Sequence, residues 1–113
     1  MSKNEELGLP FGKMRKITVA FDVDGTLIDT DGFMNIGIVN LLILLRSFKN
    51  VRIIVWSGGG LDYARHHAER LGIAKYVHKF AGKTEHQELN VDIAIDDIQD
   101  TAIGKINLIV REK

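Results

Sequence analysis

Residues 16–27 read Lys-Ile-Thr-Val-Ala-Phe-Asp-Val-Asp-Gly-Thr-Leu, an apolar run that ends in two aspartates and a glycine. The run predicts a buried strand over 16–21, and Gly25 predicts a turn directly after it. Asp22 and Asp24 therefore stand at the carboxyl end of a strand, which is where open α/β sheets bind their ligands. Two carboxylates crowded at one strand tip repel each other, so we expect a compensating cation beside them.

Strand and helix patterns alternate along the rest of the chain. Further strands are expected at 51–56, 76–80, 91–95 and 106–110, helices at 33–48 and 61–71, and a short helix opened by a capping box at 84–87. The helix over 33–48 is apolar around most of its circumference and is expected to be largely buried. Such alternation favours an α/β fold in which a parallel sheet carries helices on both faces.

Length and composition narrow the function classes. The 113 residues are enough for one compact domain over 15–113, preceded by a flexible lead-in over 1–14. Lys plus Arg equals Asp plus Glu at 15 each, so no overall basic field indicates nucleic acid, and the absence of cysteine excludes disulfides and zinc–thiolate sites. The N-terminus lacks the apolar core of a signal peptide, and the most apolar stretch, 36–45, is about half a membrane span. We therefore expect a cytoplasmic protein that does not bind membranes.

Polar residues follow four successive strands. In chain order they are Asp22 and Asp24, Ser57 with Gly58–Gly60, Lys79 and Lys83, and Asp96 with Asp97. Because parallel strands share a direction, all four groups are expected at one edge of the sheet. Clustered carboxylates bind a hard cation such as Mg²⁺, and a hydroxyl followed by glycine N–H groups at a helix start holds an anion. A lysine attracts phosphate oxygens, and a carboxylate can attack phosphorus, so together the groups indicate phosphoryl transfer.

The four groups resemble, in order, the four motifs of the haloacid-dehalogenase-like (HAD) phosphohydrolases. The segment Asp-Val-Asp-Gly-Thr at 22–26 resembles the first motif, Ser57 the second, a downstream lysine the third, and Ile-Asp-Asp at 95–97 the fourth. The resemblance runs from residue 17 to about residue 110. It implies a Rossmann-like three-layer sandwich whose five parallel strands lie in the order 5-4-1-2-3.

The resemblance also implies catalytic roles. Asp22 attacks phosphorus to form an aspartyl-phosphate, and Asp24 protonates the leaving oxygen and then activates water. Ser57, Gly58 and the motif lysine hold the phosphoryl group. For that lysine the placement at element ends favours Lys83 and leaves Lys79 open.

A metal site is implied by the same resemblance. Asp22, the backbone carbonyl of Asp24, and the Asp96–Asp97 pair are expected to hold Mg²⁺, with Asp97 slightly favoured as the direct ligand of that pair. The other member is expected to cap a helix over 98–104.

Most HAD-like enzymes carry a cap domain inserted after the first or second motif. Here one helix fills most of the chain between Asp24 and Ser57, so the resemblance is to a small capless member with an open site. The expected function is a Mg²⁺-dependent phosphatase for a phosphomonoester. The alternatives are a nucleotide or polynucleotide 3′-phosphatase and a phosphate- or metal-binding regulatory module with weak turnover. A homodimer is possible through an exposed part of 33–45.

Simpler interpretations explain less. An EF-hand loop counted from Asp22 needs an acid where Phe33 stands, and one counted from Asp29 needs an acid where Asn40 stands. The glycine run fits neither a Walker loop nor a dinucleotide fingerprint. His66 and His67 of the second helix are interpreted as solvated side chains. An ordinary solvated face is the interpretation, and a substrate-binding patch the alternative, for three basic residues: Arg65, Arg70 and Lys75.

Overall fold

The sheet is the frame of the molecule. The computed structural model describes residues 15–98 and 103–111, so the predicted lead-in at 1–14 lies outside the described residues. The strands are β1 (Ile17–Asp22), β2 (Val51–Ser57), β3 (Lys79–Gly82), β4 (Ile93–Asp96) and β5 (Ile106–Ile109). The helices are α2 (Ile36–Arg46), α3 (Leu61–Arg70) and α4 (His86–Leu89), with 3₁₀ turns η1 (Ala74–Tyr76) and η2 (Lys83–Glu85).

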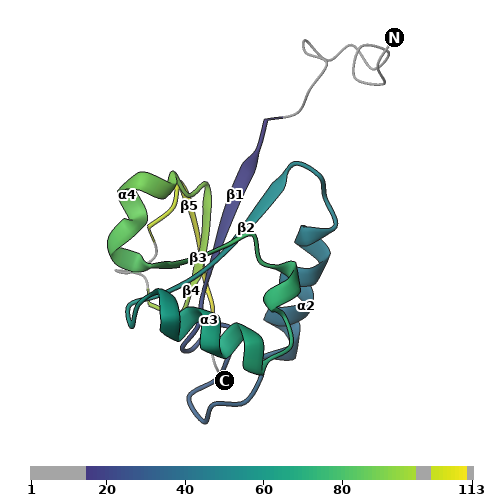
Figure 1. Cartoon of the computed structure of the whole chain (residues 1–113), viewed down its shortest axis with the longest axis vertical. Helices are drawn as coiled ribbons and strands as arrows, with labels where there is room; N and C mark the ends of the chain where they lie inside the picture. The colour runs from purple at the N-terminus through teal and green to yellow at the C-terminus, as the bar shows by residue number, and fades with distance from the viewer. Residues whose placement is uncertain (1–14, 99–102, 112–113) are drawn as a thin grey trace.

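All four strand pairings are parallel, and the strands lie in the order β3-β2-β1-β4-β5 (Figure 1). The predicted five-stranded parallel sheet and its strand order are therefore confirmed. The register places Asp22 beside Trp56 and Ser57 beside Gly82, while Phe21 pairs with Ile95. The carboxyl ends of β1, β2, β3 and β4 consequently meet at one edge, as parallel pairing requires.

Two apolar clusters lie on opposite faces of this sheet. On one face α2 and α3 pack against β1 and β2, with Val39, Leu42, Ala64 and Ala68 buried. On the other face Leu89 of α4 joins a smaller cluster around the fully buried Trp56. Figure 1 shows α2 and α4 on opposite sides of the strands. The arrangement is a Rossmann-like α/β sandwich in which one face has the thicker cover.

The helix α2 is shorter and more exposed than its sequence suggests. It begins at Ile36, because Asn35 caps it by accepting a hydrogen bond from the Ile38 N–H at 3.4 Å. Only Val39 and Leu42 are buried, while Ile36 is 66% exposed. The expectation that this helix is largely buried is wrong. Ile36 and Leu44 extend into solvent, and the other apolar side chains of α2 are only partly buried against the core: Ile38, Leu41, Ile43 and Leu45.

Two boundaries on the way to β3 and α4 also differ from expectation. The predicted strand over 76–80 begins instead at Lys79, because Ala74–Tyr76 close a 3₁₀ turn first. The predicted cap at Thr84 is wrong, since Glu85 reaches back to accept from the Gly82 N–H at 2.8 Å and α4 starts at His86. Both shifts move Lys83 to the position directly after the carboxyl end of β3. No helix in residues 15–98 or 103–111 has the length and apolar character needed to cross a membrane.

Candidate active site

A lysine between two buried aspartates forms the centre of the site. Lys83 Nζ lies 3.0 Å from Asp22 Oδ1 and also donates to Asp96 Oδ2. Asp22 is 5% exposed and Asp96 is 1% exposed, so both carboxylates have left bulk water. Asp22 ends β1 and Asp96 ends β4, and Lys83 follows β3, so three separate strand ends bring the three charges together.

The pKa values of the two buried aspartates are shifted in opposite directions. Burial raises the pKa of Asp22 to about 7, with Lys83 opposing and Asp96 adding to the rise. Burial also acts to raise the pKa of Asp96, yet hydrogen bonds from Lys83 and the Ile98 N–H hold it below its ordinary value. Burial disfavours the charge on Lys83, but the two carboxylates raise its pKa overall. Lys83 therefore stays charged, and Asp96 is its more strongly ionised partner.

A third carboxylate completes a set that fits a divalent cation. Asp22, Asp96 and Asp97 each offer an oxygen, and these oxygens lie within 4.8 Å of one another. Gly25 makes room for Asp97, because a Cβ at position 25 would lie 2.1 Å from Asp97 Oδ2. Its φ of +77° is a second reason for glycine at this position. Three hard carboxylate oxygens at this spacing match the ligands that Mg²⁺ prefers. The Asp24 side chain is not part of this set.

The hydroxyl of Ser57 stands at the end of β2, next to the glycine turn. Ser57 is 2% exposed, and its Oγ accepts a hydrogen bond from the Gly59 N–H at 2.9 Å. A cavity of about 260 Å³ brings this turn and the carboxylates together; its lining includes Asp22, Ser57, Gly58, Lys83 and Asp97. The hydroxyl and glycine backbone on one side and Lys83 on the other can hold an anion there.

The two candidate lysines are now distinguished by position. Lys79 pairs with Ile54 at the amino end of β3 and does not line the cavity, whereas Lys83 lies in it. The structure thus gathers Asp22, Ser57, Lys83 and both residues of the Asp96–Asp97 pair. The Ile98 N–H donates to Asp96 Oδ1 at 3.0 Å, and residues 99–102 of the helix predicted over 98–104 lie outside the described residues, so its cap stays a prediction.

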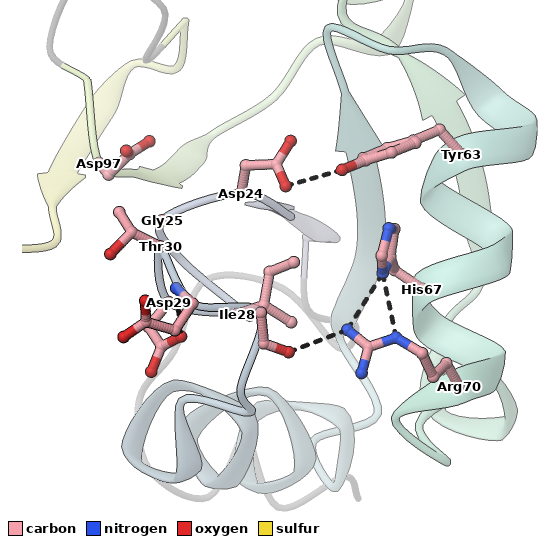
Figure 2. Close-up of a pocket in the computed structure, with 11 residues that line it drawn as sticks. Asp24, Gly25, Ile28, Asp29, Thr30, Tyr63, His67, Arg70 and Asp97 are labelled. Atoms are coloured by element: carbon pink, nitrogen blue, oxygen red, sulfur yellow. Dashed lines mark hydrogen bonds between the residues drawn. The ribbon is translucent and has the colours of Figure 1, made fainter.

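Asp24 lies at the same edge but points elsewhere. Its Oδ1 accepts a hydrogen bond from the Tyr63 hydroxyl at 2.8 Å (Figure 2). That hydrogen bond raises the pKa of Tyr63, so the phenol remains a proton donor toward Asp24 at neutral pH. Asp24 also lines both the small cavity and a second cavity of about 640 Å³. It stands where the two cavities meet.

The second cavity lies between α3 and a flap formed by residues 28–34. Ile28 and Met34 bridge the base of the flap, and Asp29 Oδ1 accepts from the Asp31 and Phe33 N–H groups, at 2.9 Å each. Tyr63, His67 and Arg70 line the opposite wall, as Figure 2 shows.

These three residues were not found from the sequence as part of a site. The sequence pattern indicates no role for Tyr63 and a solvated position for His67, and for Arg70 it indicates a solvated face with a substrate-binding patch as the alternative. Their spacing of four and then three places them on one face of α3, and α3 starts just after the Ser57 turn. That spacing, counted from the second motif, is the signal that could have indicated them.

Comparison with known proteins gives no further constraint. Neither the protein-family models nor the curated proteins yielded a match to this chain.

Proposed function

We infer that this protein is a Mg²⁺-dependent phosphatase of the HAD-like, capless type, which hydrolyses a phosphomonoester through an aspartyl-phosphate on Asp22. The observation that carries the proposal is the buried Asp22–Lys83–Asp96 cluster, with Ser57 in the same cavity. Burying two carboxylates lowers the free energy of unfolding, so such burial points to a use for them in a site. A perturbed pKa at a cleft is typical of catalytic groups. The chain between Asp24 and Ser57 holds the flap, α2 and the strand β2, with no further domain, which supports the capless assignment.

The chemistry follows from what each residue can do. A carboxylate oxygen of Asp22 attacks phosphorus as the bond from phosphorus to the leaving oxygen breaks, and Asp24 gives that oxygen its proton. Asp24 then takes a proton from a water molecule that attacks the acyl-phosphate, which returns Asp22 and releases inorganic phosphate. Ser57, the glycine N–H groups and Lys83 hold the phosphoryl oxygens as negative charge builds on them.

A divalent cation fits beside this nucleophile. Asp22, Asp96 and Asp97 would hold Mg²⁺, and the backbone carbonyl of Asp24 is the fourth ligand that the family resemblance implies. When bound, the ion neutralises charge shared between Asp22 and the phosphoryl group. It would also favour the ionised form of Asp22, whose burial otherwise raises its pKa to about 7.

The test compares turnover and binding in one series. The wild-type protein should release phosphate from p-nitrophenyl phosphate with Mg²⁺ and stop when EDTA is added. The near-isosteric Asp22→Asn variant should lose at least about 10³-fold in kcat, as expected when a nucleophile is removed. The control is Asp62→Asn, which removes an equal charge from a fully exposed side chain on α3. Wild-type rates in Asp22→Asn would contradict the mechanism.

A regulatory module makes a different set of predictions. Beryllofluoride with Mg²⁺ imitates an acyl-phosphate on a carboxylate, so it should raise the thermal unfolding temperature of the wild type and leave Asp22→Asn unchanged. That stabilisation without turnover on any phosphomonoester would favour the regulatory module. Absence of both would remove Asp22 from phosphate chemistry altogether.

A further inference from the structure

The larger cavity begins where the phosphoryl site ends. Asp24 and Asp97 line both cavities, and Asp24 is the residue that meets the leaving oxygen in the proposed reaction. A phosphoryl group over Asp22 would therefore direct the rest of its substrate toward the space of about 640 Å³ between α3 and the flap. Pockets of about 300–1,000 Å³ are the size class of small-molecule sites.

The α3 wall of this cavity is aromatic. Tyr63 and His67 meet edge to face, with ring centroids 4.5 Å apart. The Tyr63 hydroxyl is already committed to Asp24 at 2.8 Å. The remainder of its ring is an apolar surface suited to packing against a ring of the ligand.

The flap that forms the opposite wall is fastened to α3. Arg70 Nη2 donates to the Gly32 carbonyl at 3.2 Å, and Arg70 Nε donates to His67 Nδ1 at 3.3 Å (Figure 2). Two of the three guanidinium nitrogens, Nε and Nη2, thus hold the flap and the His67 ring. A cavity with a fastened wall limits the size of what enters.

The charge of the lining is negative. Four carboxylates line the cavity, on Asp24, Asp29, Asp31 and Asp97. The Arg70 guanidinium is the one cation among the lining residues. His67 also lines the cavity, but burial, followed by the charge of Arg70, lowers its pKa, so its ring is neutral at neutral pH. Even with Asp97 on a metal and Asp24 protonated, Asp29 and Asp31 outnumber the one cation. Carboxylates accept hydrogen bonds from hydroxyls and repel other anions.

We propose that this cavity holds the leaving group of a small phosphomonoester: an uncharged, hydroxyl-bearing group with a ring that packs on Tyr63. On this basis the flap carboxylates Asp29 and Asp31 reject leaving groups that carry further negative charge, including polynucleotide ends. Asp31 is the one to vary, because Asp29 also holds the flap through its bonds to two N–H groups. The inference rests on the proposed phosphatase function, and it narrows the substrate class of that same site.

A matched pair of substrates tests the charge selection. We would compare 4-(hydroxymethyl)phenyl phosphate with 4-carboxyphenyl phosphate, which share a ring and one phosphoryl group and differ in a hydroxyl against a carboxylate. The wild type should favour the hydroxymethyl compound by roughly 3- to 10-fold in kcat/KM, the range expected for one nearby like charge. Asp31→Asn should reduce this ratio by about 3-fold, whereas the control Asp62→Asn, outside the lining, should leave it unchanged.

Two Tyr63 variants test the aromatic wall. Tyr63→Phe keeps the ring but removes the hydrogen bond to Asp24, so it should lower kcat and leave KM nearly unchanged. Tyr63→Ala should also raise KM for both substrates. Direct titration of both compounds into the turnover-deficient Asp22→Asn protein gives the same comparison as binding affinities.

The possible failures can be told apart. Turnover of both compounds at equal kcat/KM, or an unchanged ratio in Asp31→Asn, would overturn this inference and leave the phosphatase standing. Faster release of phosphate from a 3′-phosphorylated oligonucleotide than from either compound would overturn it too. No turnover of any substrate would overturn the proposed function and the inference with it.

Discussion

The two opposite edges of the sheet shift the pKa of an aspartate in opposite directions. At the carboxyl edge Asp22 is buried against Lys83, and its pKa is raised to about 7. At the amino edge Asp92 accepts a hydrogen bond from the Thr18 N–H at 2.8 Å and pairs with Lys105 at 3.3 Å. The Thr18 hydrogen bond holds the pKa of Asp92 below its ordinary value. Each aspartate has a lysine partner, yet only Asp92 is more easily ionised than in the unfolded chain.

The difference shows which ionised aspartate favours folding and which one opposes it. Asp92 joins β1 to the start of β4 while its side chain keeps contact with water, so ionisation favours folding. Asp22 has lost its water and faces a second carboxylate, so ionisation disfavours folding. A charge that opposes folding is retained when the site needs it. This difference supports the proposal that the carboxyl edge carries the function, while the contacts of Asp92 hold the amino edge together.

Removing the central lysine should give the largest change in stability. Lys83→Met leaves Asp22 and Asp96 buried without their cation, and breaking such a cluster costs about 3–5 kcal/mol in the free energy of unfolding. Urea unfolding at neutral pH, in EDTA, measures the loss. The matched control is Lys79→Met, a lysine at the amino end of the strand that precedes Lys83 and outside the cluster, for which we expect a change below about 0.5 kcal/mol.

A double variant then identifies the cause. If stranded carboxylates produce the loss, adding Asp22→Asn to Lys83→Met should restore much of the stability, because one of the two charges is gone. Equal effects of Lys83→Met and Lys79→Met would mean that the cluster carries no special energy.

The strand order and most residues of the small cavity could be predicted from the amino-acid sequence. The polar residues at the ends of β1, β2 and β4 could be assigned to one edge, because parallel strands share a direction. Lys83 could be favoured over Lys79 only through its place at the end of an element, and the predicted start of β3 lies three residues too early. The metal set of Asp22, Asp96 and Asp97 likewise depended on the topology being right.

The parts that could not be predicted depend on tertiary distance. The contact between Tyr63 and Asp24 spans 39 positions of the chain, and nothing in the local pattern around Tyr63 marks it. The prediction that α2 is largely buried failed for a related reason. Composition shows which side chains are apolar, but the rest of the fold sets how many faces of the helix meet the sheet. Tyr76 ends a 3₁₀ turn, Ala74–Tyr76, where its β-type side chain suggested the start of a strand.

Stability against pH should separate the two aspartates by the sign of their slopes. The pKa of Asp22 lies near 7 in the folded protein and 3.8 unfolded, so the folded state binds more protons between these values. Its contribution is full below about pH 4 and is lost as pH rises toward 7, by roughly 2–4 kcal/mol. The measurement is the difference in unfolding free energy between wild type and Asp22→Asn in EDTA. A difference that stays constant from pH 4 to 7 would contradict the raised pKa.

The smallest effect is expected at the amino edge. Asp92→Ala removes the acceptor of the Thr18 N–H and two exposed ion partners, which should cost about 1–2 kcal/mol at neutral pH, since exposed pairs contribute little. The lowered pKa of Asp92 has the opposite sign to that of Asp22: its contribution is present above pH 3.8 and is lost as pH falls below that value. Urea unfolding between pH 2.5 and about pH 6 should therefore show the wild-type advantage over Asp92→Ala shrinking on acidification.

Asp62→Ala serves as the control for Asp92→Ala, because it deletes an exposed carboxylate and should shift stability by less than about 0.5 kcal/mol. The beryllofluoride stabilisation should survive in Asp92→Ala, because Asp92 lies at the far edge of the sheet from Asp22. Loss of that stabilisation, or a wild-type advantage that grows as pH falls, would mean that the two edges are not separate in function. Their independence is what allows Asp22 to oppose folding: the hydrogen bonds around Asp92 stabilise β1 and β4 from the other end.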